Sequence, residues 1–222
     1  MLVEGEHELV IFDELFRDEL AAVGAELFAL RGASNLKNTS DAQLLFKYTD
    51  ARLVVVLDNE DTGRVQGIWE RACAAADEGV DYFEILDEFT EGGWTSEAKF
   101  LSEYCALAIT LAARGRISFF TLSKPDIPEY LPVTSFVPEM KKRRSWEQLR
   151  ESYVAATNSS KKPPNFKNWM VSQHHARYDE ATLRAAVREL DHIPEEFSGL
   201  LDHVSASGRG EGSAGLPSPG SF

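Results

Sequence analysis

The chain has 222 residues, 43% of them hydrophobic and 27% charged, which is enough apolar material for one packed domain and an appendage. Acidic residues outnumber basic ones by 36 to 23, and the net charge of −13 argues against a protein that holds nucleic acid by bulk electrostatics, while a local basic stripe or a metal-mediated phosphate site stays open. The two cysteines, Cys73 and Cys105, lie inside helical patterns and predict neither a zinc pair nor a disulfide framework. An acidic start without a signal sequence, and no apolar run near the ~20 residues of a membrane span, favour a cytoplasmic protein.

The first part of the chain predicts a strand, a helix and a second strand. Residues 1–3 form a short apolar strand end followed by acidic residues, and apolar residues then recur at helical spacing over 9–20. A second buried strand is expected at 25–30, followed by a turn-rich loop at 31–35 and a helix at 40–48.

A third strand, at residues 53–57, is the centre of the predicted fold. Its five consecutive apolar residues, without polar alternation, are typical of a strand buried on both faces of a parallel sheet. Asp58, Glu60 and Asp61 follow, and the strand must surface there because unpaired buried carboxylates are costly. A helix is expected at 65–76. The alternative is a solvated turn in which Asp61 or the next threonine caps that helix.

The remaining elements complete a repeated strand–turn–helix pattern. Residues 80–89 fit either a short helix or an edge strand, and 96–113 predict a strong helix stopped by Gly115. A fourth strand is expected at 116–122. The pattern predicts an α/β fold, Rossmann-like, with a small parallel four-stranded sheet flanked by helices.

Beyond Pro138 the chain becomes more polar and helical. Helical patterns are expected at 146–156, 166–175, 180–190 and 194–204, and a Gly/Ser/Pro-rich tail follows that predicts disorder. We therefore expect a catalytic-type domain at 1–135, a helical C-terminal extension at 136–204 and a disordered tail at 205–222.

Polar side chains follow three of the predicted strands and should meet at one edge of the sheet. They are Glu4 and Glu8 after the first strand, Asp58 and Glu60 after the central strand, and Lys124, Asp126 and Glu129 after the fourth. Converging carboxylates repel one another and raise one another's pKa values, and a divalent cation removes this penalty. Oxygen ligands suit Mg²⁺ and Mn²⁺, so the sequence predicts a site for one of these ions.

The order of these motifs resembles that of Toprim domains. Leu-Val-Glu-Gly-Glu-His-Glu at 2–8 is similar to their opening Glu-Gly motif, and Val-Val-Val-Leu-Asp-Asn-Glu at 54–60 to their Asp-x-Asp strand end, with Glu replacing the second Asp. Residues 30–35 occupy the place of the glycine-rich loop. The segment at 122–130 resembles its counterpart in nucleases of the OLD (overcoming lysogenization defect) family, where a lysine and downstream acids complete the site.

This resemblance implies a divalent-metal-dependent DNA endonuclease that hydrolyses phosphodiesters. It implies that Glu4, Glu8, Asp58 and Glu60 hold one or two Mg²⁺ or Mn²⁺ ions, with Glu4, Asp58 and Lys124 as the catalytic residues. Zinc modules of primases and recombination proteins do not fit two distant cysteines, and no topoisomerase tyrosine domain is recognisable, which leaves the nuclease branch.

The resemblance implies two partners, DNA, whose phosphate backbone would bind through the metal, and a separate ATPase subunit. OLD nucleases resemble an ATPase joined to a Toprim domain, and this sequence has no phosphate-binding loop motif of its own. A homodimer is a further possible assembly, and no membrane partner is expected. The alternatives are a non-catalytic Toprim-like module that binds nucleic acid or nucleotide, and a structural subunit that docks an ATPase.

Two further features have both a functional and a structural interpretation. His7 could contact a metal or a phosphate, or could be a solvated residue at a helix start. Basic stretches at 141–144 and 161–167, interleaved with Trp146, Phe166 and Trp169, could track DNA by stacking on its bases. The structural alternative is a solvated helix surface over buried tryptophans.

Overall fold

A parallel sheet of four strands forms the centre of the molecule. The computed structural model describes residues 1–3, 5–29, 39–91, 98–137, 144–158 and 160–209. The strands are β1 (Leu2–Val3), β2 (Phe28–Ala29), β3 (Leu53–Asp58) and β4 (Ile117–Leu122), in the order β2-β1-β3-β4. β3 and β4 pair in register along their whole length, and β1 pairs with both β2 and β3. The α/β class with a parallel four-stranded sheet is confirmed.

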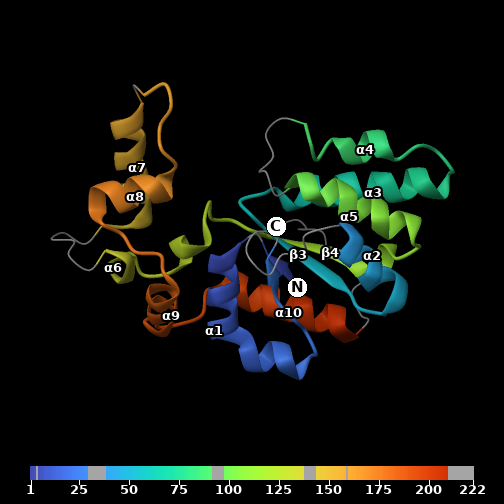
Figure 1. Ribbon diagram of the computed structural model, residues 1–222, viewed down its shortest axis with the longest axis horizontal. Helices are drawn as coiled ribbons and strands as arrows, with labels where there is room; N and C mark the ends of the chain where they lie inside the picture. Colours follow the sequence, from blue (N-terminus) through green and yellow to red (C-terminus); the bar gives the residue numbers. More distant parts are fainter. Residues whose placement is uncertain (4, 30–38, 92–97, 138–143, 159, 210–222) are drawn as a thin grey trace, which may run out of the picture.

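Both faces of β3 are covered by helices, which explains its unbroken apolar sequence. Val54 and Val56 belong to a core shared with α1 (Glu6–Ala22) and α10 (Glu195–Arg209). Val55 and Leu57 face the opposite core, formed by α2 (Thr39–Tyr48), α3 (Thr62–Asp77), α4 (Phe83–Asp87) and α5 (Ala98–Thr110). Figure 1 shows α1 and α10 on one side of the sheet and α3, α4 and α5 on the other. All six residues of β3 are buried.

Some boundaries differ from the sequence-based expectations. β1 and β2 have two residues each, and the ambiguous segment at 80–89 contains the helix α4. Helix α5 ends at Thr110, before Gly115, because the chain turns at Ala112, which has a left-handed φ of 53°. The Ala113 N–H then donates to the Ala108 carbonyl at 2.7 Å and closes the helix end without a glycine.

The C-terminal part divides into helices near the sheet and helices beside it. Two short 3₁₀ turns, η1 (Arg114–Arg116) and η2 (Ile127–Tyr130), flank β4, and α6 (Val133–Phe136), α7 (Trp146–Thr157), α8 (Phe166–His174) and α9 (Glu180–Arg188) follow. Figure 1 shows α7 and α8 to one side of the sheet, whereas α9 and α10 return to α1. Helix α10 continues to Arg209, five residues into the segment expected to be disordered, and 210–222 lie outside the described residues.

Aromatic packing fixes α7 and α8 relative to each other. Trp146, Phe166 and Trp169 are each less than a tenth exposed, and the Trp146 indole N–H donates to the Leu131 carbonyl at 2.8 Å. The Arg150 guanidinium lies over the Phe166 ring, 4.3 Å from its centroid. These aromatic rings are core residues and offer no stacking platform to bases. The alternative in which the tryptophans are buried is therefore confirmed.

An ion pair ties α7 to η2, the short turn that follows β4. Both oxygens of the Glu129 carboxylate accept from Arg150 Nε at 2.9 Å, and Arg150 Nη2 makes a further close contact with Oε1. Glu129 is only 6% exposed, and the Arg150 side chain is 31% exposed. A bidentate pair of this kind fixes orientation as well as distance, so it holds α7 against η2.

Glu129→Gln should therefore destabilise the protein by about 2 kcal/mol, because a hydrogen-bonded charge pair is lost and Arg150 keeps only a neutral acceptor. Chemical denaturation measures the change. The matched control is the Glu129→Gln/Arg150→Gln double variant, which should cost less than the sum of the two single variants. Equal stabilities of wild type and Glu129→Gln would show that α7 is held by its aromatic core alone.

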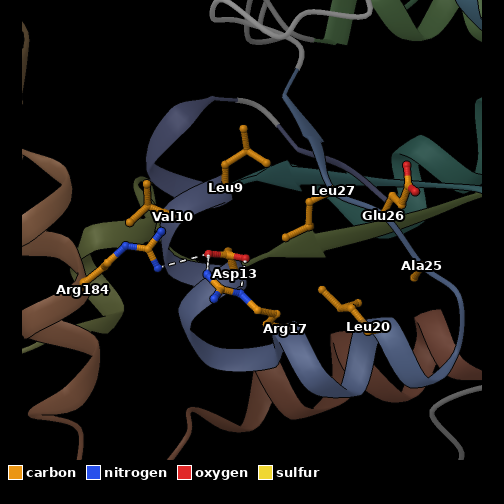
Figure 2. Close-up of a pocket in the computed structure, with 10 residues that line it drawn as sticks. Leu9, Val10, Asp13, Arg17, Leu20, Ala25, Glu26, Leu27 and Arg184 are labelled. Atoms are coloured by element: carbon orange, nitrogen blue, oxygen red, sulfur yellow. Dashed lines mark hydrogen bonds and ion pairs between the residues drawn. The ribbon is translucent and has the colours of Figure 1, made fainter.

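Charged residues also fasten α9 to α1, around a pocket of about 510 Å³ shown in Figure 2. Arg184 contacts Glu14 Oε2 at 2.7 Å and Asp13 Oδ2 at 3.1 Å, and Arg17 binds the same Asp13 carboxylate from its own helix. Leu9, Val10 and Leu27 are among the apolar residues of the wall (Figure 2). Because carboxylates already occupy both guanidinium groups, we regard this network as a structural clamp.

Candidate metal centre

Three carboxylates converge at the carboxyl edge of the sheet. Glu8 lies in the first turn of α1, just after β1; Asp58 is the last residue of β3; and Asp126 follows β4 and precedes η2. One oxygen atom of each lies within 4.8 Å of the others. We call Glu8, Asp58 and Asp126 the acid triad. The predicted convergence of strand ends thus brings Glu8, Asp58 and Asp126 together, and Asp126, expected at this edge, takes a place that the predicted metal ligands did not give it.

Gly5 gives Glu8 its position. The Gly5 N–H donates to Glu8 Oε2 at 2.8 Å, so the side chain folds back on the start of its own helix. A Cβ atom at Gly5 would lie 3.2 Å from that oxygen, closer than most such contacts, which gives a steric reason for glycine at this position. Glu8 is 4% exposed, and burial raises its pKa above the ordinary value, more than the backbone N–H donors and Lys167 lower it.

The other two members of the triad are also shielded from water. Asp58 is 7% exposed and the Asp126 side chain 17%. Burial raises the pKa of Asp126, although Lys167 beside it acts in the opposite direction. Three shielded carboxylates at this spacing strongly disfavour full ionisation unless a cation accompanies them. The all-oxygen donor set fits Mg²⁺ or Mn²⁺.

A lysine from the helical extension lies against the triad. Lys167 Nζ, in the first turn of α8, is 2.9 Å from Asp126 Oδ1 and 2.9 Å from His7 Nδ1. Burial and then Lys167 lower the pKa of His7 to about 4, so His7 is neutral near pH 7 and its Nδ1 can accept from the ammonium. The His7 ring stacks on Tyr178, with centroids 5.9 Å apart. The Lys167 ammonium has three donors, and these two contacts use two of them.

The other predicted site residues have different places. Glu4 lies outside the described residues, as does the loop at 30–35. Glu60 is not part of the triad. The Asp61 side chain accepts from the Arg64 N–H at 2.6 Å and caps α3, which confirms the capping interpretation for this acid.

The position of Lys124 after β4 suggests a catalytic role at the metal site, but its ammonium contacts η2 instead. Its Nζ donates to the Glu129 carbonyl oxygen at 2.9 Å and lies 5.1 Å from the centroid of the Tyr130 ring. The ammonium recorded at the triad is that of Lys167. Asp126 is recognisable in the sequence as an acid after the fourth strand. Lys167 lies 41 positions later, at the end of the basic stretch 161–167, and nothing in the sequence places it beside Asp126.

No family model, curated protein or solved structure matches this chain. Among the described residues, none of the helices combines the length and apolar character needed to cross a lipid bilayer.

The raised pKa of Glu8 predicts a pH-dependent response to metal. The folded protein keeps a proton on Glu8 at pH values where the unfolded chain has lost it. Stability therefore falls as the pH rises above the pKa that Glu8 has in the unfolded chain. His7, with its pKa lowered to about 4, contributes the opposite slope, so the Glu8 share is the difference between wild type and Glu8→Gln. Mn²⁺ should raise the unfolding midpoint of wild type more near pH 7 than near pH 5.

Thermal unfolding of both proteins in EDTA and in Mn²⁺ measures this effect. Glu8→Gln should show a smaller Mn²⁺ shift that depends less on pH. If both proteins respond equally to Mn²⁺ at each pH, Glu8 is not a ligand.

Proposed function

We propose that this chain is a Toprim-type, Mg²⁺- or Mn²⁺-dependent nuclease module that hydrolyses DNA phosphodiesters. The observation that carries the proposal is the acid triad at the carboxyl ends of three adjacent parallel strands, with the Lys167 ammonium directly beside it. Ligand sites of open α/β sheets lie at this edge. The shielded carboxylates supply oxygen ligands, and the lysine supplies a positive charge for a phosphate.

Each residue would have a distinct part in the reaction. Glu8, Asp58 and Asp126 would hold the divalent ion, which supplies charge neutralisation at the phosphate and a water of lowered pKa. Lys167 would contact a non-bridging phosphate oxygen and stabilise the charge that develops there. His7 would hold that ammonium in place. Glu4 and Glu60 remain ligand candidates through the family resemblance, and an OLD-type nuclease with a separate ATPase partner remains the proposed setting.

Incubation of supercoiled plasmid with the purified protein tests this function. Mn²⁺ should produce nicked or linear DNA, and EDTA should stop the reaction. The Asp58→Asn variant serves as the blank for contaminating nuclease. Absence of cleavage with Mg²⁺ and with Mn²⁺ would refute catalysis by this chain alone.

A non-catalytic binding module is the second candidate. The Lys167–Asp126 ion pair already neutralises one carboxylate of the triad, so the fold has an internal cation of its own. In this case the protein would bind DNA or nucleotide with the same affinity in EDTA and in Mn²⁺, and plasmid would stay intact. Calorimetric titration with Mn²⁺ separates the two cases, because only the nuclease requires the triad to bind the ion.

A further inference from the structure

The positive charge of this acidic protein is concentrated in one segment. Residues 138–178 contain nine Lys and Arg against three Glu, a net charge of +6 in a chain whose total is −13. Helices α7 and α8 lie within this segment, beside the carboxyl edge of the sheet (Figure 1). A local basic region on an acidic protein can attract a polyanion to one place while the rest of the surface repels it.

Several basic residues outside this segment make hydrogen bonds or ion pairs with other parts of the protein. Arg71 pairs with Glu88, Arg114 donates to the Cys73 carbonyl, and Arg116 donates to the carbonyls of residues 45, 46 and 51. Their charges are therefore committed to holding helices and turns together.

By comparison, basic side chains that flank α7 and α8 are not engaged in contacts of this kind. Arg144, Lys161 and Lys162 are exposed, and within the ranges that the structure describes none of these three side chains makes a hydrogen bond or ion pair. Lysines without a carboxylate partner can neutralise phosphates without first breaking an ion pair.

The two adjacent lysines precede an anchored loop end at Pro164 and Asn165. The Tyr153 hydroxyl donates to the Pro164 carbonyl at 2.7 Å, which ties the loop between α7 and α8 back to α7. Asn165 caps α8 by accepting from the Asn168 N–H at 2.8 Å. Two consecutive prolines further restrict this loop. Lys161 and Lys162 are thus presented from a connection whose end is anchored, next to the positive end of the α8 dipole.

The same loop leads directly to the acid triad. Lys167 follows Lys162 by five residues, so their Cα atoms are at most about 17 Å apart. That is the length of about five phosphates of one DNA strand along the helix axis. A strand with one phosphate at the triad would therefore have neighbouring phosphates within reach of the loop.

We infer that Lys161 and Lys162 bind the DNA backbone beside the phosphate to be cut. The inference rests on the proposed function and adds the surface that holds the substrate. It requires only electrostatic contact with phosphates, so it predicts little sequence preference.

Fluorescence anisotropy with a labelled duplex of about 30 base pairs, in EDTA, tests the inference without cleavage. The Lys161→Ala/Lys162→Ala variant should bind about 10-fold more weakly than wild type at low salt, and its log–log salt slope should be shallower by about 1.8. Each single variant should show about half the change in slope. Lys47→Ala is the matched control, since Lys47 is an exposed lysine on α2 of the body, and it should bind as wild type does.

The outcomes separate the inference from the proposed function. Weakened binding by the lysine variants supports the surface even if no cleavage is observed with any metal. Unchanged affinity and salt slope in the double variant overturn the inference, even if wild type cuts plasmid. Equal weakening by Lys47→Ala also overturns it, because the effect would then be one of net charge.

Discussion

Asp58→Asn should reduce Mn²⁺-dependent plasmid cleavage by more than about 100-fold, because it removes the charged ligand at the centre of the acid triad. Asp58 ends β3, the strand that lies between β1 and β4, so its side chain stands between the elements that supply Glu8 and Asp126. Asparagine has nearly the same shape but donates through its amide nitrogen and carries no charge. The change therefore weakens the metal site while leaving the strand and its cores in place.

Asp61→Asn is the matched control for this experiment. Asp61 lies three residues later in the same turn, yet its side chain caps α3 and is not part of the triad. Since asparagine caps a helix about as well as aspartate, this variant should keep both its stability and its cleavage rate. Calorimetry with Mn²⁺ should show lost binding only for Asp58→Asn. Cleavage at the wild-type rate by Asp58→Asn would exclude the triad as the catalytic centre.

The meeting of the three carboxylates at one edge could be predicted from the sequence because local patterns determine it. The apolar run of β3 fixes where the strand surfaces, and so where Asp58 lies. Glu8 follows a short strand and a glycine, and the structure shows why the glycine matters: the Glu8 carboxylate folds back onto the Gly5 N–H. Both residues reach the same edge because parallel strands end on the same side of a sheet.

The lysine at the site could not be predicted, because tertiary packing places it. Lys167 reaches Asp126 only when α8 is oriented by the Trp146 and Phe166 packing and by the Glu129–Arg150 pair. None of these contacts leaves a periodic signal in the sequence. The expected C-terminal extension therefore provides a side chain to the candidate site, in addition to covering the sheet through α10.

Lys167→Met should lower the cleavage rate by about 100-fold with a smaller change in KM, because the ammonium would act mainly on charge that develops at the phosphate in the transition state. Methionine retains the length of the aliphatic stem but loses all three donors. Lys167→Arg should restore only part of the rate, since a planar guanidinium cannot contact Asp126 and His7 with the geometry of an ammonium group.

Lys124→Met is the informative comparison, because Lys124 is the lysine that the strand-end motif suggests and Lys167 is the one that the fold places at Asp126. If the fold is the correct guide, Lys124→Met should cleave within about 3-fold of wild type. His7→Gln offers a second comparison, since its amide oxygen can still accept from the ammonium, whereas His7→Leu cannot and should follow Lys167→Met. A large loss in Lys124→Met together with a normal rate in Lys167→Met would reverse the assignment. It would mean that α8 is displaced from the triad when DNA binds, and that the lysine after β4 takes over the phosphate.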